Sequence, residues 1–182
     1  MKPLPIATAI ALAAAAPVVL ADGDKIRARL TGYDEVPSVS TPAAGEFEAR
    51  ISRDEGLIEY ELSYSGLQGT VQQSHIHFAQ KGVNGSIVVW LCQTTTTPAP
   101  AAVAGLTPFC PQSGTVSGQI TAANVIAAAT ASQMIVAGEL AEVVAAIRAH
   151  RAYVNVHSTP LTPGGEIRGQ IGGRGRGGPH HD

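Results

Sequence analysis

Apolar and polar residues alternate along most of the chain with a period of two. In the segment 25–30, Ile26, Ala28 and Leu30 alternate with basic residues. Such alternation is typical of a strand with one buried face and one face in water. Comparable patterns predict seven further strands, at 46–51, 58–64, 72–78, 86–91, 115–120, 153–157 and 166–171.

One segment has a helical period instead. Leu140, Val143, Val144 and Ile147 recur at i, i+3, i+4 and i+7, which predicts a helix with one apolar face. Short turns rich in Gly and Pro separate the strands, and an Asn-Gly pair before the fifth strand is a strong hairpin signal. We therefore expect a mostly β fold. It should be an antiparallel Greek-key sandwich or barrel of about eight strands, with one short helix before the last hairpin.

The N-terminal end has the composition of a signal peptide. Lys2 gives a short positive start, an Ala-rich apolar run follows from Ile6 to Leu20, and the small residue Ala21 precedes a polar stretch. This pattern predicts a signal peptide over residues 1–21, with cleavage after Ala21. A membrane anchor is the alternative, but the run is short for a span of roughly 20 residues and prolines interrupt it.

Export follows from this prediction, and we expect a periplasmic or secreted protein with no membrane span after cleavage. The domain should cover residues 22–171, and the Gly-, Arg- and His-rich tail at 172–182 should be disordered. Charged residues make up only 14% of the chain and the formal net charge is -2. The chain therefore lacks the excess of positive charge that is typical of a nucleic-acid-binding protein.

The chain contains two cysteines, Cys92 and Cys110. In an oxidising compartment a single pair is expected to form a disulfide. The bond would close a loop rich in Thr and Pro and stabilise the fold by roughly 3 kcal/mol. The alternative, in which one of the two thiols is a metal ligand or a nucleophile, stays open at this point.

Three histidines are the candidate metal ligands of this sequence. His75 and His77 occupy one predicted strand at i and i+2, so both side chains point to the same face. His157 takes the equivalent polar side of a later strand. Three neutral imidazoles that meet at one ion suit copper or zinc. The alternative is a trio of solvated or hydrogen-bonded histidines on a sheet.

Residues around these histidines should orient them. If the last two strands form a hairpin, Glu166 or Arg168 lies across from His157 on the same face. Glu166 is then a candidate acceptor for an imidazole N–H, and Arg168 is a candidate partner of Glu166. Asn155 shares the polar side of its strand with His157, so we expect it to lie beside the ligands as well.

Several separate blocks of sequence match a known pattern. They are LTGYDEVP at 30–37, HIH at 75–77 with the Gly at 82 and Asn-Gly at 84–85, AYVNVHS at 152–158 and PGGEIRGQI at 163–171. Together these blocks resemble the CHRD domain, which is named for chordin and also occurs in many exported bacterial proteins. The resemblance covers roughly residues 25–171 and implies an exported β-rich domain. In chordin, such domains belong to an extracellular antagonist of bone morphogenetic proteins.

A weaker similarity is to copper/zinc superoxide dismutase, which has a Greek-key barrel, an early His-x-His and a disulfide-tethered loop.

From the histidine spacing and the CHRD resemblance together, we expect an exported CHRD-domain protein that binds a metal ion through His75, His77 and His157. Copper is the expected ion, and zinc is the less favoured one. One alternative is a metal-free interaction module for another extracellular or periplasmic protein. The other is a copper-dependent oxidoreductase. A non-catalytic role is favoured, and the sequence assigns no catalytic residue.

Overall fold

The alternating segments form antiparallel strands in a computed structural model, which describes residues 23–160 and 162–173. These strands are β1 (Asp24–Thr31), β2 (Ala44–Ile51), β3 (Ile58–Ser65), β4 (Thr70–Phe78), β5 (Ser86–Cys92), β6 (Gly114–Ile120), β7 (Ala152–Thr159), β8 (Thr162–Gln170) and β9 (Gly172–Gly173). The eight longer strands correspond to the eight that the alternation predicts. The mostly β fold class is therefore confirmed.

Helical structure is confined to short segments. The two α-helices of the described ranges are α1 (Ala101–Ala104) and α2 (Leu140–Arg148), and single 3-10 turns lie at Gly32–Asp34, Ala122–Asn124 and Ala131–Gln133. Helix α2 is the predicted one, since its apolar positions are buried. Within 23–160 and 162–173, no helix has the length and apolar character needed to cross a bilayer.

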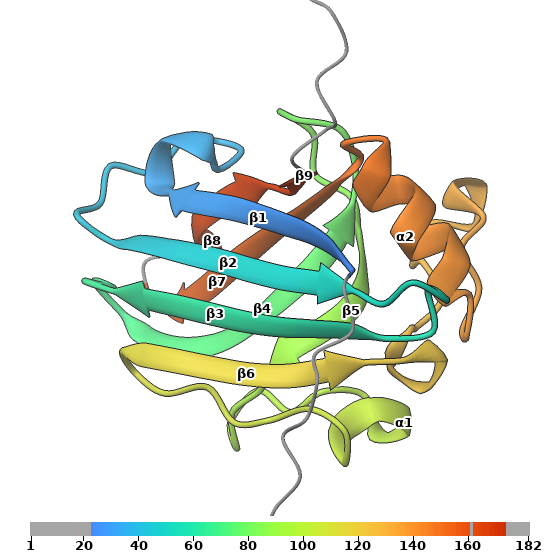
Figure 1. Ribbon diagram of the computed structural model, residues 1–182. Helices are drawn as coiled ribbons and strands as arrows, with labels where there is room; N and C mark the ends of the chain where they lie inside the picture. Colours follow the sequence, from blue (N-terminus) through green and yellow to red (C-terminus); the bar gives the residue numbers. More distant parts are fainter. Residues whose placement is uncertain (1–22, 161, 174–182) are drawn as a thin grey trace, which may run out of the picture.

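The strands form one sheet that curls into a nearly closed barrel. Its order is β5-β4-β7-β8-β1-β2-β3-β6, with β9 paired to β1. Figure 1 shows β1, β2, β3 and β6 in front of β4, β5, β7 and β8, with α2 beside the barrel. Strand β8 returns to lie next to β1, as in a Greek key rather than a meander. This order places β4 against β7, although much of the chain separates them.

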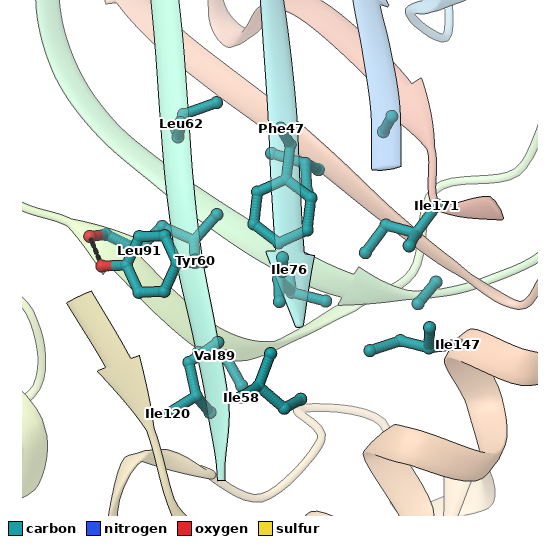
Figure 2. Packing of buried hydrophobic residues seen from close by; sticks show 14 of the residues in the cluster. Phe47, Ile58, Tyr60, Leu62, Ile76, Val89, Leu91, Ile120, Ile147 and Ile171 are labelled. Atoms are coloured by element: carbon teal, nitrogen blue, oxygen red, sulfur yellow. Dashed lines mark hydrogen bonds between the residues drawn. The ribbon is translucent and has the colours of Figure 1, made fainter. Parts of the chain in front are cut away.

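The core fills the space between the two halves. Figure 2 shows Phe47 and Leu62 from β2 and β3 together with Ile76 and Leu91 from β4 and β5, all of which belong to one buried cluster. The Tyr60 hydroxyl donates a hydrogen bond of 2.6 Å to the carbonyl oxygen of Leu91, which ties β3 to β5 across the barrel. These inward residues are the apolar members of the alternating patterns.

The outer face of β4, β7 and β8 is polar but is not in water. His75, Asn155 and Arg168 face one another across these three strands, and each is at most 2% exposed. The histidines lie on the polar side of the sheet, as the alternation predicts. The alternation left open whether loops cover this side, and the structure shows that they do.

Two loops form the cover. Arg168 Nη2 donates to the carbonyl oxygen of Val83 at 2.8 Å and Nη1 donates to Asn84 Oδ1 at 3.1 Å, which holds the β4–β5 loop against β8. Asn84 Nδ2 in turn donates to the carbonyl oxygen of Val36 at 3.0 Å, which joins this loop to the segment that follows β1. The polar face is therefore an interior layer beneath loops.

The ends of the domain need one correction. Gly172 and Gly173, which the composition assigns to the disordered tail, form β9 and pair with β1. Backbone pairing needs no side chain, so a glycine-rich composition does not reveal it. The predicted signal peptide at 1–21 and the remainder of the tail, 174–182, lie outside the described residues.

Candidate metal site

Three histidines meet beneath the covering loops. His75 and His77 flank Ile76 on β4, and because Ile76 is in the core the two imidazoles share the opposite face. His157 comes from β7, where it pairs across with Gln73 of β4. The structure therefore brings the three predicted ligands together.

The distances between their nitrogens suit a common ion. The candidate ligand atoms of the three residues all lie within 4.8 Å of one another. His75 Nδ1 is 3.2 Å from His157 Nε2. Two nitrogens that bind one ion at about 2.0–2.1 Å in a tetrahedral arrangement lie roughly 3.3 Å apart. The same spacing also suits a hydrogen bond between a protonated and an unprotonated nitrogen.

The orientation of His77 is fixed by the covering loop. His77 Nδ1 lies 2.9 Å from the carbonyl oxygen of Gly85, which can only accept, so Nδ1 carries the proton and donates. The Nε2 atom then has the lone pair. It is buried and has no hydrogen-bond partner among the described residues, and the same holds for His75 Nε2. A backbone acceptor behind a metal-binding imidazole is a common arrangement, because it selects the tautomer.

Burial keeps these imidazoles neutral. Desolvation lowers the pKa of His75 well below its usual value, and the neighbouring His157 and His77 lower it further. Desolvation also lowers the pKa of His77 to about 4, although its hydrogen bond to Gly85 opposes the shift. At neutral pH both side chains therefore offer lone pairs without first losing a proton.

Aromatic rings fix the imidazole planes. The Tyr153 ring stacks on His77 with centroids 4.6 Å apart and an interplanar angle of 4°. The Arg168 guanidinium lies 3.3 Å from the centroid of the Tyr153 ring, which makes a three-layer stack. Trp90 packs edge-on against His75, with centroids 4.3 Å apart. These contacts leave the two rings little freedom to rotate.

Residues 26–171 match the CHRD domain, over most of the chain. The chain belongs to the CHRD domain family. No curated protein and no solved structure matches it. The matched region contains all three histidines and both cysteines.

Arg168 of this CHRD domain does not lie across from His157, which was one of the two predicted arrangements. We expected Glu166 or Arg168 directly across from His157, but Arg168 pairs across with Asn155. The register between β7 and β8 shifts after Val156, so a simple hairpin count fails there. Arg168 holds the β4–β5 loop and stacks on Tyr153, and so supports His77 from behind.

Glu166 is fully buried at the end of the CHRD barrel. Its Oε1 accepts hydrogen bonds from Thr41 Oγ1 at 2.7 Å and from the Gln68 backbone N–H at 2.8 Å. Its Oε2 accepts a hydrogen bond from the Ser158 hydroxyl. These bonds fasten the β1–β2 and β3–β4 connections to β8. The predicted role of Glu166 as an acceptor for an imidazole N–H stays a prediction.

Asn155 lies beside the triad, as expected, and leads to a residue that the sequence analysis missed. The Asn155 side chain lies close enough to His77 and to Glu35 to affect the pKa of both. Glu35 is 5% exposed and reaches this layer from the segment after β1. A lone acidic residue in a loop carries no signal of burial. Its place within the LTGYDEVP block of the family was the one available pointer.

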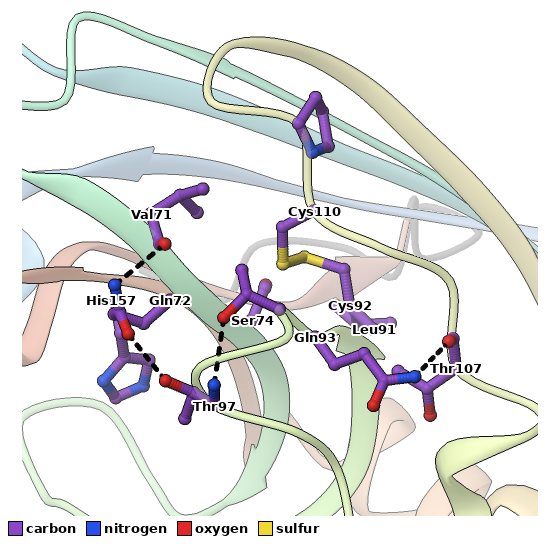
Figure 3. The surroundings of a disulfide bond; sticks show 12 residues. Val71, Gln72, Ser74, Leu91, Cys92, Gln93, Thr97, Thr107, Cys110 and His157 are labelled. Atoms are coloured by element: carbon purple, nitrogen blue, oxygen red, sulfur yellow. Dashed lines mark hydrogen bonds between the residues drawn. A yellow bond between two sulfur atoms is a disulfide. The ribbon is translucent and has the colours of Figure 1, made fainter.

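The disulfide tethers a loop next to the site. Cys92 and Cys110 form the predicted bond. Figure 3 shows the loop that leaves Cys92, in which Thr97 Oγ1 donates to Gln72 Oε1 at 2.6 Å. Gln72 is the extra residue in the irregular stretch of β4 opposite His157. The loop is therefore fastened to β4 at the edge of the histidine cluster.

Proposed function

We propose that this CHRD domain binds one metal ion, copper, through His75 Nδ1, His77 Nε2 and His157 Nε2. The observation that carries the proposal is the buried, unpartnered Nε2 of His77, held with its lone pair toward two other imidazoles. Buried polar atoms in native proteins nearly always have a partner, so such an atom points to a ligand.

A hydrogen-bonded histidine cluster explains less of the geometry. A bond between His75 and His157 would satisfy one nitrogen of each ring, but it leaves His77 Nε2 and His75 Nε2 without partners. Burying polar groups without partners destabilises the fold. With an ion bound through His75 Nδ1, the only ring nitrogen of His75 and His77 that still lacks a partner is the N–H at His75 Nε2.

The donor set favours copper. The three candidate ligand atoms are all imidazole nitrogens, with no thiolate or carboxylate among them. Such ligands suit both copper and zinc, and copper(II) binds more tightly than zinc at comparable sites. Three ligands also leave one coordination position open. That open position is what a copper-dependent oxidoreductase, our third hypothesis, would use.

Export belongs to the same proposal. The disulfide between Cys92 and Cys110 is typical of proteins outside the reducing cytosol, and the predicted signal peptide at 1–21 would direct the chain there. We therefore place the mature protein in the periplasm or outside the cell.

The test is metal content together with spectroscopy on untagged protein spanning 22–182 and on a version that ends at 173, which removes the two C-terminal histidines. Near-stoichiometric copper in both, with nitrogen hyperfine structure in the copper(II) EPR spectrum, is the expected result. The single tryptophan, Trp90, packs on His75, so copper(II) should also quench its fluorescence.

The variants separate the site from other histidines. His77→Ala should lose the bound copper and the quenching. The matched control is His150→Asn, because His150 lies outside the triad and has a positive φ of 55° that Asn tolerates. Copper bound equally by His77→Ala and the parent protein would refute the site. If neither version binds copper or zinc, the metal-free interaction module takes its place.

A further inference from the structure

A cation in this site needs a counter-charge. The triad consists of imidazoles and supplies no negative charge, and the guanidinium of Arg168 already lies in the same buried layer. Buried charge is stable in proteins only when it is paired. An ionised carboxyl group nearby would therefore stabilise an ion at His75, His77 and His157.

Glu35 is placed to provide it. The 3-10 turn at Gly32–Asp34 directs the chain over the outer face, and the Glu35 N–H closes this turn onto the carbonyl oxygen of Gly32 at 3.1 Å. Its carboxyl group is buried, and Oε1 has no hydrogen-bond partner among the described residues. Glu166, by contrast, accepts hydrogen bonds on both oxygens.

A glycine makes room for this carboxyl group. A Cβ atom at Gly165 would lie 2.3 Å from Glu35 Oε1 and 2.9 Å from Asn155 Nδ2, so any larger residue would collide with both. The φ of Gly165 is 130°, which also favours glycine. Glu35, Gly165 and Asn155 therefore lie against one another beneath the loops.

Asn155 links Glu35 to the triad. It pairs across with His75 of β4 on one side and with Arg168 of β8 on the other. Its side-chain amide affects the pKa of both Glu35 and His77. Glu35 is thus coupled to the ligands through an intervening amide and is not itself a ligand.

We propose that Glu35 is the counter-charge of the metal site, which keeps its proton while the triad is empty and releases it when a cation binds. This inference rests on the proposed metal binding. The reaction is balanced, because one cation enters the protein and one proton leaves it. The charged or titratable groups that face Glu35 are Arg168 from β8, Asp34 from its own segment and Tyr153 from β7.

The pKa of Glu35 suits this exchange of a proton for a metal ion. Burial raises its pKa from 4.5 to about 7, against the opposing attraction of Arg168. His75 and His77 are already neutral near pH 6, so they release no proton on binding. A cation in the triad would lower the pKa of Glu35, so the contribution of Glu35 to metal affinity should rise with pH up to about 7 and then level off.

The experiment compares the parent protein with Glu35→Gln, which replaces the carboxyl group by a neutral amide of the same shape. Copper(II) is titrated from pH 5.5 to 8 with Trp90 fluorescence as the readout, and the ratio of the two dissociation constants at each pH cancels the competing buffer. We expect the affinity advantage of the parent to grow by up to about tenfold per pH unit as the pH rises toward 7 and to stay constant above it, since one proton is exchanged at Glu35. Glu48→Gln is the control, because it removes an exposed carboxylate of β2 outside this buried layer and should give a pH-independent ratio.

Carboxyl carbon NMR distinguishes failure of this inference from failure of the site. The Glu35 signal should titrate near pH 7 in metal-free protein and at a clearly lower pH with zinc bound, because zinc(II) is diamagnetic. If metal binds but the Glu35 titration stays in place, the counter-charge role is wrong. The role is equally wrong if the ratio of dissociation constants between Glu35→Gln and the parent is constant with pH. If no metal binds, the proposed site itself is wrong.

Discussion

Glu35 should make the metal-free protein less stable as the pH rises. Its pKa is 4.5 in an unfolded chain and about 7 in the folded domain. The folded state therefore holds a proton that the unfolded state has lost between these two values, and stability falls as pH increases through this interval. At 1.36 kcal/mol per pH unit, the interval corresponds to about 3 kcal/mol.

Replacement of Glu35 by Gln removes this penalty, because the amide has no charge to bury. In chelator-treated protein, urea unfolding should give similar free energies for the parent and Glu35→Gln at pH 4.5. At pH 8 the variant should be more stable by about 2–3 kcal/mol. Far-UV circular dichroism reports the transition, and equal denaturant slopes would show that the two proteins unfold alike. A variant that is equally stable, or less stable, at pH 8 would refute the reasoning.

Four further outcomes follow from the structure. Cys92→Ser/Cys110→Ser should lower the free energy of unfolding by roughly 3 kcal/mol, measured in urea, because 18 positions separate the two residues. Phe47→Ala, at a fully buried position of the core, should cost about 3–5 kcal/mol in the same assay. Arg168→Met should speed amide exchange in the β4–β5 loop, measured by mass spectrometry, because two hydrogen bonds to that loop are lost. Removal of bound copper by a chelator should restore Trp90 fluorescence and lower the melting temperature, as expected for a ligand that binds only the folded state.

The strands could be predicted because each has one face in the core. Ile26, Phe47 and Leu62 belong to apolar sets that repeat at every second position of their strands, and that spacing is visible in the sequence. The placement of His75 and His77 on one face followed from the same rule. His157 joins them only because two strands that lie far apart in the chain are neighbours in the sheet. The sequence does not show which strands are neighbours, so the position of His157 could only be inferred.

The covering of the site could not be predicted from periodicity. A sheet face that carries His75, Asn155 and Arg168 is expected to be solvated, and only the path of the loops buries it. Irregular segments have no repeat, so Glu35 in a loop is expected to be an exposed acid. The irregular pairing of β7 with β8 at His157 could not be predicted either, because one register shift in a ladder is invisible in an alternating pattern.

The two parts of the histidine triad lie far apart in the sequence, since 82 positions separate His75 from His157, so the ribosome adds His157 much later. Pairing β4 with β7 closes a long loop, which costs conformational entropy. This cost arises before the contacts between the two strands can stabilise the closed loop. A nascent or truncated chain that ends before β7 contains only the His-x-His pair of the triad. The complete site is thus a product of finished folding, and metal taken up through it would mark chains that have reached their native topology.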